Sequence, residues 1–186
     1  PTETALRLTR FLSTTLKRVN AVINFGVGGA YLQANTDRQP QLLDICLAEQ
    51  EVFGDLGICL RDGVEYLPSS LTGEVVFQLD LALHRQSREI FEGLGISPFS
   101  GNFITVSAIT ATRQRGAMLQ QRWQGLCENM EGAAVARVCR EFSVACLELR
   151  AVSNYVEDRN PENWRLREAC LHAAESAALL IKGMSA

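Results

Sequence analysis

Residues 127–154 read CENMEGAAVARVCREFSVACLELRAVSN, and this segment carries the clearest helix-then-strand pattern of the chain. The acidic residue Glu131 opens a run of small and apolar side chains at helical spacing, from Met130 to Phe142. An apolar strand pattern follows from Val144 to Val152 and ends in Ser-Asn. In an open α/β sheet, ligands bind at the ends of such strands. The sequence therefore predicts that Glu131 and Asn154 converge on a small molecule.

The rest of the chain alternates helix and strand patterns, without an internal repeat or a low-complexity linker. Helices are predicted over 6–16, over 80–93 with Asp80 as N-cap, over a short basic segment capped by Thr112, and over 164–182. Strands are predicted over 19–25, 42–52 and 103–109, while 54–73 is typical of a loop. This alternation predicts one α/β domain over residues 1–186, with helices on both faces of a sheet.

Composition excludes several classes of function. The chain has 186 residues, 47% of them hydrophobic, and a net charge of −3, which gives no electrostatic reason to expect nucleic acid as a partner. No apolar run has the length of a membrane span, and no signal peptide pattern is present. The six cysteines form no C-x-x-C pair, and with only two histidines a metal site is poorly supported. We expect reduced thiols and a cytoplasmic location.

Each candidate also has a purely structural interpretation. An acidic residue in the first turn of a helix is favoured by the helix dipole, so Glu131 could serve the helix alone. Asn154 after a strand is typical of a turn. The glycines Gly26, Gly28 and Gly29 lack the full G-x-G-x-x-G spacing, so they indicate either a tight turn or a backbone that approaches a ligand closely.

Three segments in order, AVINFGVGG at 21–29, NMEGAA at 129–134 and RAVSN at 150–154, resemble the purine nucleoside phosphorylase and methylthioadenosine/S-adenosylhomocysteine nucleosidase superfamily. The resemblance is greatest to its futalosine hydrolases, and GNFITVS at 101–107 is similar to the strand that leads to the purine pocket. It implies a three-layer α/β/α phosphorylase/hydrolase-like fold with a mixed central sheet. It also implies a reaction without a cofactor or metal, and a homo-oligomer.

The resemblance implies roles at matching positions. Glu131 would bind the ribose 2′- and 3′-hydroxyls and stabilise the positive charge that develops on the sugar. Met130 would pack beneath the sugar, Gly28 and Gly29 would approach the substrate, and Ile109 and Thr110 would line the base pocket. Asn154 takes the place of the residue that contacts the purine N7 and 6-substituent. Its carboxamide can donate to a 6-oxo group and accept from N7–H, which favours hypoxanthine or guanine over adenine.

Two departures from the family pattern bear on activity. The relatives carry strands and a water-activating carboxylate upstream of the segment that matches residues 1–5, so we expect this chain to lack the N-terminal portion of the fold and to be nearly inactive alone. Val27 stands where methylthioadenosine nucleosidases carry a Ser near the attacking water. Glu49 and Glu51, near a strand end, are interpreted as solvated rather than as a substitute base.

Three basic residues, Arg113, Arg115 and Arg122, form one face of the short basic helix. A solvated face is one interpretation, and contact with an anionic substrate tail is the other, because futalosine bears a carboxylated aromatic group. The predicted function is hydrolysis of futalosine to release hypoxanthine. A 6-oxopurine nucleoside phosphorylase, a methylthioadenosine nucleosidase and a non-catalytic nucleoside-binding or structural remnant stay open as alternatives.

Overall fold

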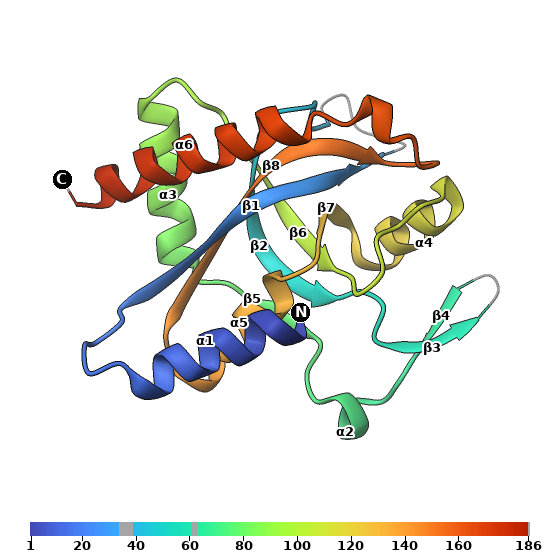
Figure 1. The fold of residues 1–186 in the computed structure, drawn as a ribbon, viewed down its shortest axis with the longest axis horizontal. Coiled ribbons are helices and arrows are strands. Elements are labelled where there is room, and N and C mark those ends of the chain that lie inside the picture. The colour runs from blue at the N-terminus through green and yellow to red at the C-terminus, as the bar shows by residue number, and fades with distance from the viewer. Residues whose placement is uncertain (34–38, 61–62, 186) are drawn as a thin grey trace.

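The structure, a computed structural model, describes residues 1–33, 39–60 and 63–185 (Figure 1). Its helices are α1 (Thr2–Thr14), α2 (Ser69–Thr72), α3 (Leu81–Gly93), α4 (Arg113–Trp123), α5 (Gly132–Glu141) and α6 (Leu166–Met184), with a 3₁₀ helix η1 at Pro161–Asn163. Its strands are β1 (Ala21–Tyr31), β2 (Ile45–Phe53), β3 (Gly57–Leu60), β4 (Gly63–Tyr66), β5 (Val76–Gln78), β6 (Phe99–Thr105), β7 (Gly125–Asn129) and β8 (Ala145–Val156).

The central sheet is mixed and has the strand order β5-β2-β6-β7-β1-β8. β1 runs parallel to β8 along its whole length and antiparallel to β7 at its end. β2 also pairs with β8 in antiparallel orientation, so the sheet curls until its two sides meet. β3 and β4 form a separate hairpin that projects from the body of the molecule (Figure 1).

Helices cover the sheet on both sides, as the alternation of patterns predicts (Figure 1). α5 packs its alanines, among them Ala133 and Ala136, against one face of the sheet, and α1 lies on α5. On the other face α6 packs Ala169 and Leu180 against Leu147 and its neighbours, and α3 packs beside α6. Small side chains let both helices approach the strands closely, which buries two apolar layers.

The two predicted helix caps are confirmed. Asp80 accepts a hydrogen bond from Leu83 N at 2.8 Å at the start of α3. Thr112 Oγ1 accepts one from Arg115 N at 3.2 Å at the start of α4. Each oxygen satisfies a backbone N–H that has no partner within its own helix.

Several predicted boundaries are wrong. The strand predicted over 19–25 continues through Gly26, Gly28 and Gly29 as β1, so of the two interpretations of these glycines the tight turn is wrong. β8 continues to Val156, and Asn154 is therefore part of a strand rather than a turn after it. β6 spans 99–105 instead of 103–109, which leaves 106–112 as the connection to α4. The segment 54–73, predicted as a loop, contains the β3–β4 hairpin and α2, and the short strands β5 and β7 were not predicted.

Candidate active site

The site is built along the glycines of β1. Gly26 pairs with Arg150 of β8, and Gly29 pairs with Asn154. A Cβ added at Gly29 would meet Asn154 Nδ2 at 3.1 Å, and one at Gly28 would meet Glu128 O at 2.8 Å. Glycine is therefore required at these positions, because β7 and side chains of β8 approach β1 closely. This close approach brings the NMEGAA and RAVSN segments to the same strand.

Glu131 stands at the N-terminal end of α5, as predicted. Its backbone N–H and that of Gly132 donate to Asn129 Oδ1 at 3.0 and 2.7 Å. Thr105 Oγ1 accepts from Ala133 N at 2.7 Å, so three backbone donors of the first turn are satisfied by side chains of β7 and β6. The Glu131 side chain is itself 41% exposed and can accept hydrogen bonds from a ligand. Met130 beside it is half-buried.

Arg150 is the nearest charged neighbour of Glu131. Its side chain is only 5% exposed, and Nη1 lies 3.3 Å from Glu131 Oε2 and donates to Val27 O at 3.2 Å. Burial alone would lower the pKa of Arg150, but the charges of Glu148 and Glu131 more than offset this and raise it. The guanidinium therefore stays charged and holds one side of the Glu131 carboxylate.

Two further carboxyl groups lie beneath α5, and sequence analysis did not assign them to the site. Glu51 of β2 and Glu148 of β8 are both fully buried, so the interpretation of Glu51 as solvated is wrong, whereas Glu49 is exposed as predicted. Glu148 Oε1 accepts from Arg150 Nε at 2.8 Å. The sequence signal for Glu148 was a charged residue between two leucines, because such a residue is seldom buried without a partner. Glu51 gave no such signal, since it ends the polar run Glu49-Gln50-Glu51.

Asn154 lines a cavity of about 360 Å³ together with Thr110 and residues of the segment that follows β8. Its Oδ1 accepts from Ser153 Oγ at 2.8 Å and its Nδ2 donates to Tyr155 O at 3.0 Å. A carboxamide has two N–H donors and two acceptor lone pairs, so one of each is left to face a ligand. The donor and acceptor that the sequence predicts for a purine base are therefore available.

Thr110 and Ile109 differ in what they offer to that cavity. Thr110 is buried and spends its polar groups on Glu128, with its N donating at 3.0 Å and its Oγ1 at 2.5 Å. Tyr31 Oη donates to the same carboxylate at 2.8 Å. Burial, then the charge of Glu128, raises the pKa of Tyr31. Thr110 thus lines the cavity with both of its donors already committed to Glu128, while Ile109 is 48% exposed and is not among the residues that line the cavity.

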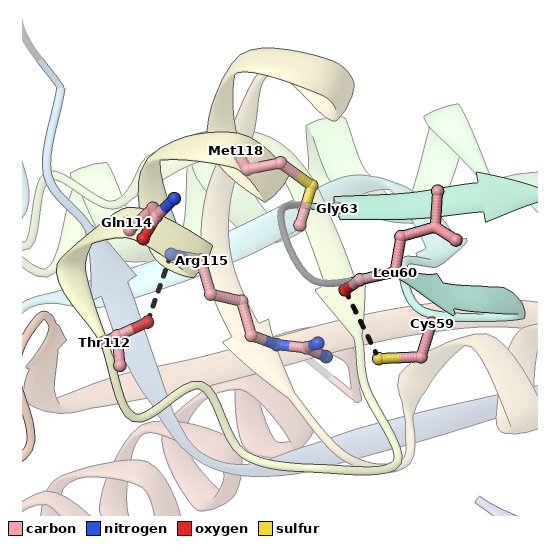
Figure 2. Close-up of a pocket in the computed structure, with 7 residues that line it drawn as sticks. All are labelled: Cys59, Leu60, Gly63, Thr112, Gln114, Arg115 and Met118. Atoms are coloured by element: carbon pink, nitrogen blue, oxygen red, sulfur yellow. Dashed lines mark hydrogen bonds between the residues drawn. The ribbon is translucent and has the colours of Figure 1, made fainter.

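The arginines of α4 each have a partner. Arg113 pairs with Glu157 and Arg115 with Asp55, both at 3.2 Å, and Arg122 lies over the rings of Tyr66 and Trp123. Figure 2 shows Arg115 extending from α4 toward the β3–β4 hairpin, where it lines a separate cavity of about 210 Å³. The predicted site residues do not line that cavity.

Within 1–33, 39–60 and 63–185, no cluster of three or more His, Cys, Asp or Glu residues could hold a metal ion. No helix in these ranges is long and apolar enough to cross a membrane. All six cysteines are free thiols.

Comparison with known proteins gives consistent relatives. A family model described as the phosphorylase superfamily matches residues 1–186. The futalosine hydrolase of Thermus thermophilus is 35% identical over 169 residues, which cover 88% of this chain and 70% of that protein. The futalosine hydrolase of Streptomyces coelicolor is 33% identical, over 80% of this chain and 59% of its own length.

Among solved structures, the futalosine hydrolase of Helicobacter pylori strain 26695 superposes with a TM-score of 0.83 at 20% identity. The match covers 97% of this chain and 75% of that one. At this identity the likeness concerns the fold, and it agrees with the mixed sheet and the covering helices described above.

Proposed function

Because this chain belongs to the phosphorylase superfamily, we propose that it is an N-ribosyl hydrolase that cleaves futalosine and releases hypoxanthine. The observation that carries the proposal is the placement of Glu131 and Asn154 around one glycine-rich strand. Arg150 joins Glu131 to Gly26 of that strand, and Asn154 stands beside Gly29. A nucleoside laid along β1 would have its ribose at Glu131 and its base at Asn154.

The proposed chemistry follows from these side chains. Glu131 accepts hydrogen bonds from both ribose hydroxyls, and its negative charge stabilises the oxocarbenium-like sugar as the glycosidic bond lengthens. Asn154 donates to the 6-oxo group of hypoxanthine and accepts from N7–H as the base leaves. Hypoxanthine leaves with the electron pair of the glycosidic bond and takes up a proton from solvent at N7. Water then attacks C1′ and releases a proton to solvent, which gives the free sugar. The reaction transfers the ribosyl group from the base to water without a change of oxidation state, and Glu131 and Asn154 are the side chains that we assign to binding and to departure of the base.

Hydrolysis is favoured over phosphorolysis by the state of Arg150. A phosphate nucleophile requires a cation or a set of donors near C1′. Arg150, the buried cation next to Glu131, already pairs with Glu148 at 2.8 Å and with Glu131 at 3.3 Å. We therefore propose water as the nucleophile. We do not assign Glu128, Glu51 or Glu148 to the activation of this water, because each is committed to buried partners.

We further propose that the protein works as a homo-oligomer in the cytoplasm, with no nucleic acid or membrane as partner. The exposed apolar residues of the β3–β4 hairpin, Ile58 and Leu60, are 47% and 51% exposed and support a contact with a second copy. The six free thiols support a reducing compartment.

The test measures both binding and products. The chain is incubated in phosphate buffer with futalosine or with methylthioadenosine, and free bases and sugars are separated by chromatography. We expect hypoxanthine with free sugar, no sugar 1-phosphate, and little adenine. Cleavage of methylthioadenosine at an equal or higher rate contradicts the substrate assignment, and sugar 1-phosphate as the product establishes a phosphorylase.

We expect the reaction to be slow, because the carboxylates named above are committed to buried partners and no general base is assigned to the attacking water. A positioned general base contributes about 10²–10⁴-fold to such a rate. Binding of inosine, which carries hypoxanthine and a ribose, is therefore measured in parallel by calorimetry. Failure to bind inosine and failure to release hypoxanthine together favour the non-catalytic alternative.

A further inference from the structure

Two buried carboxyl groups meet under the first turn of α5. Glu51 comes from β2 and Glu148 from β8, and neither side chain is exposed to solvent. A Cβ added at Gly132 would overlap Glu51 Oε1 and Glu148 Oε2, so both oxygens face the α-carbon of that glycine. Glycine at 132 therefore makes room for a pair of carboxyl groups next to Glu131.

Glu51 is connected to Glu131 through the cap of α5. Its Oε1 accepts from Asn129 Nδ2 at 2.7 Å, and its Oε2 lies 2.7 Å from Thr105 Oγ1. Asn129 and Thr105 are the side chains that hold the first backbone N–H groups of α5, including that of Glu131. Glu51 thus fixes the orientation of the carboxamide that anchors the Glu131 backbone.

Glu148 is connected to Glu131 through Arg150. Its Oε1 lies 2.8 Å from both Nε and Nη2 of the guanidinium, while Nη1 reaches Glu131 Oε2 at 3.3 Å. Arg150 is thereby shared between a buried carboxylate and an exposed one. The contacts of the guanidinium with Glu148 are shorter than its contact with Glu131. Glu148 therefore keeps the guanidinium from moving closer to Glu131.

The charge balance of this cluster requires a proton. Three carboxyl groups surround one cation, and two of them have lost all contact with water. Burial, and then the charge of Glu148, raises the pKa of Glu51 well above its ordinary value. Glu148 Oε2 is buried and has no hydrogen-bond partner among the described residues, so it is the acceptor that a protonated neighbour would fill.

We propose that Glu51 and Glu148 form a buried pair that shares one proton, with Glu51 donating to Glu148, and that this pair positions Glu131 for the ribose diol. The inference rests on the proposed function, because it assigns Glu131 to the sugar. Glu51 acts through Asn129 and Glu148 acts through Arg150, so both are positioning residues. With Glu51 neutral, the charges of Glu148 and Arg150 cancel, and Glu131 keeps its own charge for the substrate.

The proton is tested by infrared spectroscopy of the whole chain at pH 8, where other carboxyl groups are ionised. A protonated carboxylic acid gives a carbonyl band separate from those of carboxylates and amides. We expect this band in the natural chain and in the control Glu49→Gln, an exposed residue of the same strand. We expect it to vanish in Glu51→Gln. Absence of the band from the natural chain, or its persistence in Glu51→Gln, overturns the shared proton.

Positioning is tested by the ratio of affinities for inosine and 2′-deoxyinosine, which isolates recognition of the diol. In Glu148→Gln, Arg150 loses its buried partner and binds Glu131 more tightly, so we expect the ratio to fall at least fivefold. Glu49→Gln, a change at an exposed residue of the same strand outside the cluster, is the matched control and should keep the ratio within about twofold. Glu148→Asp withdraws the charge by one methylene and should lower the ratio as well, which covers the case in which Glu148→Gln does not fold.

The outcomes separate this inference from the proposed function. A folded Glu148→Gln or Glu148→Asp protein with the ratio of the natural chain overturns the positioning role while leaving the nucleosidase assignment intact. A natural chain that binds neither nucleoside contradicts the proposed function, and with it the role of Glu131 on which positioning depends. The infrared band still decides the shared proton in that case.

Discussion

Asn154 offers one donor and one acceptor, and this distinguishes purines by their 6-substituent. Its position beside Gly29 fixes where the base would lie, while Ser153 and Tyr155 fix the orientation of the carboxamide. A carboxylate at the same place would accept from a 6-amino group and, when protonated, donate to N7. On the proposed function, we therefore expect base selectivity to depend on whether residue 154 carries a carboxamide or a carboxylate.

We predict that Asn154→Asp shifts selectivity toward adenine nucleosides. A mispaired buried polar group costs about 1–3 kcal/mol, so the ratio of kcat/KM for futalosine over methylthioadenosine should fall about 10-fold or more. Steady-state release of the two bases measures it. Glu49→Gln serves as a control, since Glu49 is exposed and does not line the cavity of Asn154. An unchanged ratio in Asn154→Asp would show that the base is read elsewhere.

Glu131 is predicted to act through its charge. Glu131→Gln should leave α5 intact because Gln and Glu have similar helix propensities and because Asn129 and Thr105 hold the first turn. A neutral hydrogen bond is about half as strong as a charge-assisted one, so turnover should fall about 10²-fold. The measurement is hypoxanthine release together with a melting curve. Full turnover in a folded variant returns Glu131 to a role at the helix start alone.

Of the residues proposed for the site, those in the motifs could be predicted, and those that support them could not. Glu131 and Asn154 stand out because each is polar at the end or edge of an apolar pattern. Glu51 ends the polar run Glu49-Gln50-Glu51, which is typical of a solvated strand end, and Glu148 is a single charge between two leucines. Their burial depends on Gly132, Asn129 and Arg150 meeting them from other elements, which no local pattern reveals.

Segment lengths and periodicity predicted the long helices well and the short strands poorly. β7 has only five residues, and Glu128 interrupts its apolar pattern. Glu128 can be buried there because Tyr31 and Thr110, from distant segments, donate hydrogen bonds to it. β1 continues through four residues that include three glycines. Glycine is suited to these positions because neighbouring atoms leave little space for a Cβ. Tertiary contacts overrode local propensity in both cases.

The segment between β8 and α6 carries the cation best placed for a substrate tail. Arg159 and Trp164 line the same cavity as Asn154, and the guanidinium lies 5.3 Å from the centre of the Trp164 ring. Arg159 forms no ion pair with any described carboxylate, unlike Arg113. This arrangement suits a carboxylated aromatic group, with the ring on Trp164 and the carboxylate on Arg159.

We therefore predict that Arg159→Ala raises KM for futalosine about fivefold and leaves the affinity for inosine unchanged, because inosine has no carboxylated tail. An exposed charged contact is worth at most about 1 kcal/mol, which sets the size of the effect. The matched control is Arg113→Ala, whose guanidinium already pairs with Glu157. An equal loss for both ligands would mean that Arg159 shapes the cavity rather than reading the tail.

Closure of the sheet places the Glu51–Glu148 pair inside the core. β2 pairs with both β6 and β8, so Glu51 and Glu148 are covered by strands on each side and by α5 above. A buried acid that keeps its proton lowers the free energy of unfolding at every pH at which the same group is ionised in the unfolded chain. Stability of the whole molecule is therefore linked to the state of Glu51.

The direction of the pKa shift of Glu51 determines how stability changes with pH. The pKa of Glu51 is raised above its ordinary value of 4.5, so its contribution to stability is fully present below that pH and is lost as pH rises toward the folded-state pKa. While only the folded state holds the proton, the free energy of unfolding falls by about 1.4 kcal/mol per pH unit. Glu51→Gln does not titrate and should lack this fall. Urea unfolding of the natural chain, of Glu51→Gln and of Glu49→Gln between pH 5 and 8 measures the difference, and parallel pH profiles for the natural chain and Glu51→Gln would mean that Glu51 is ionised in the folded protein.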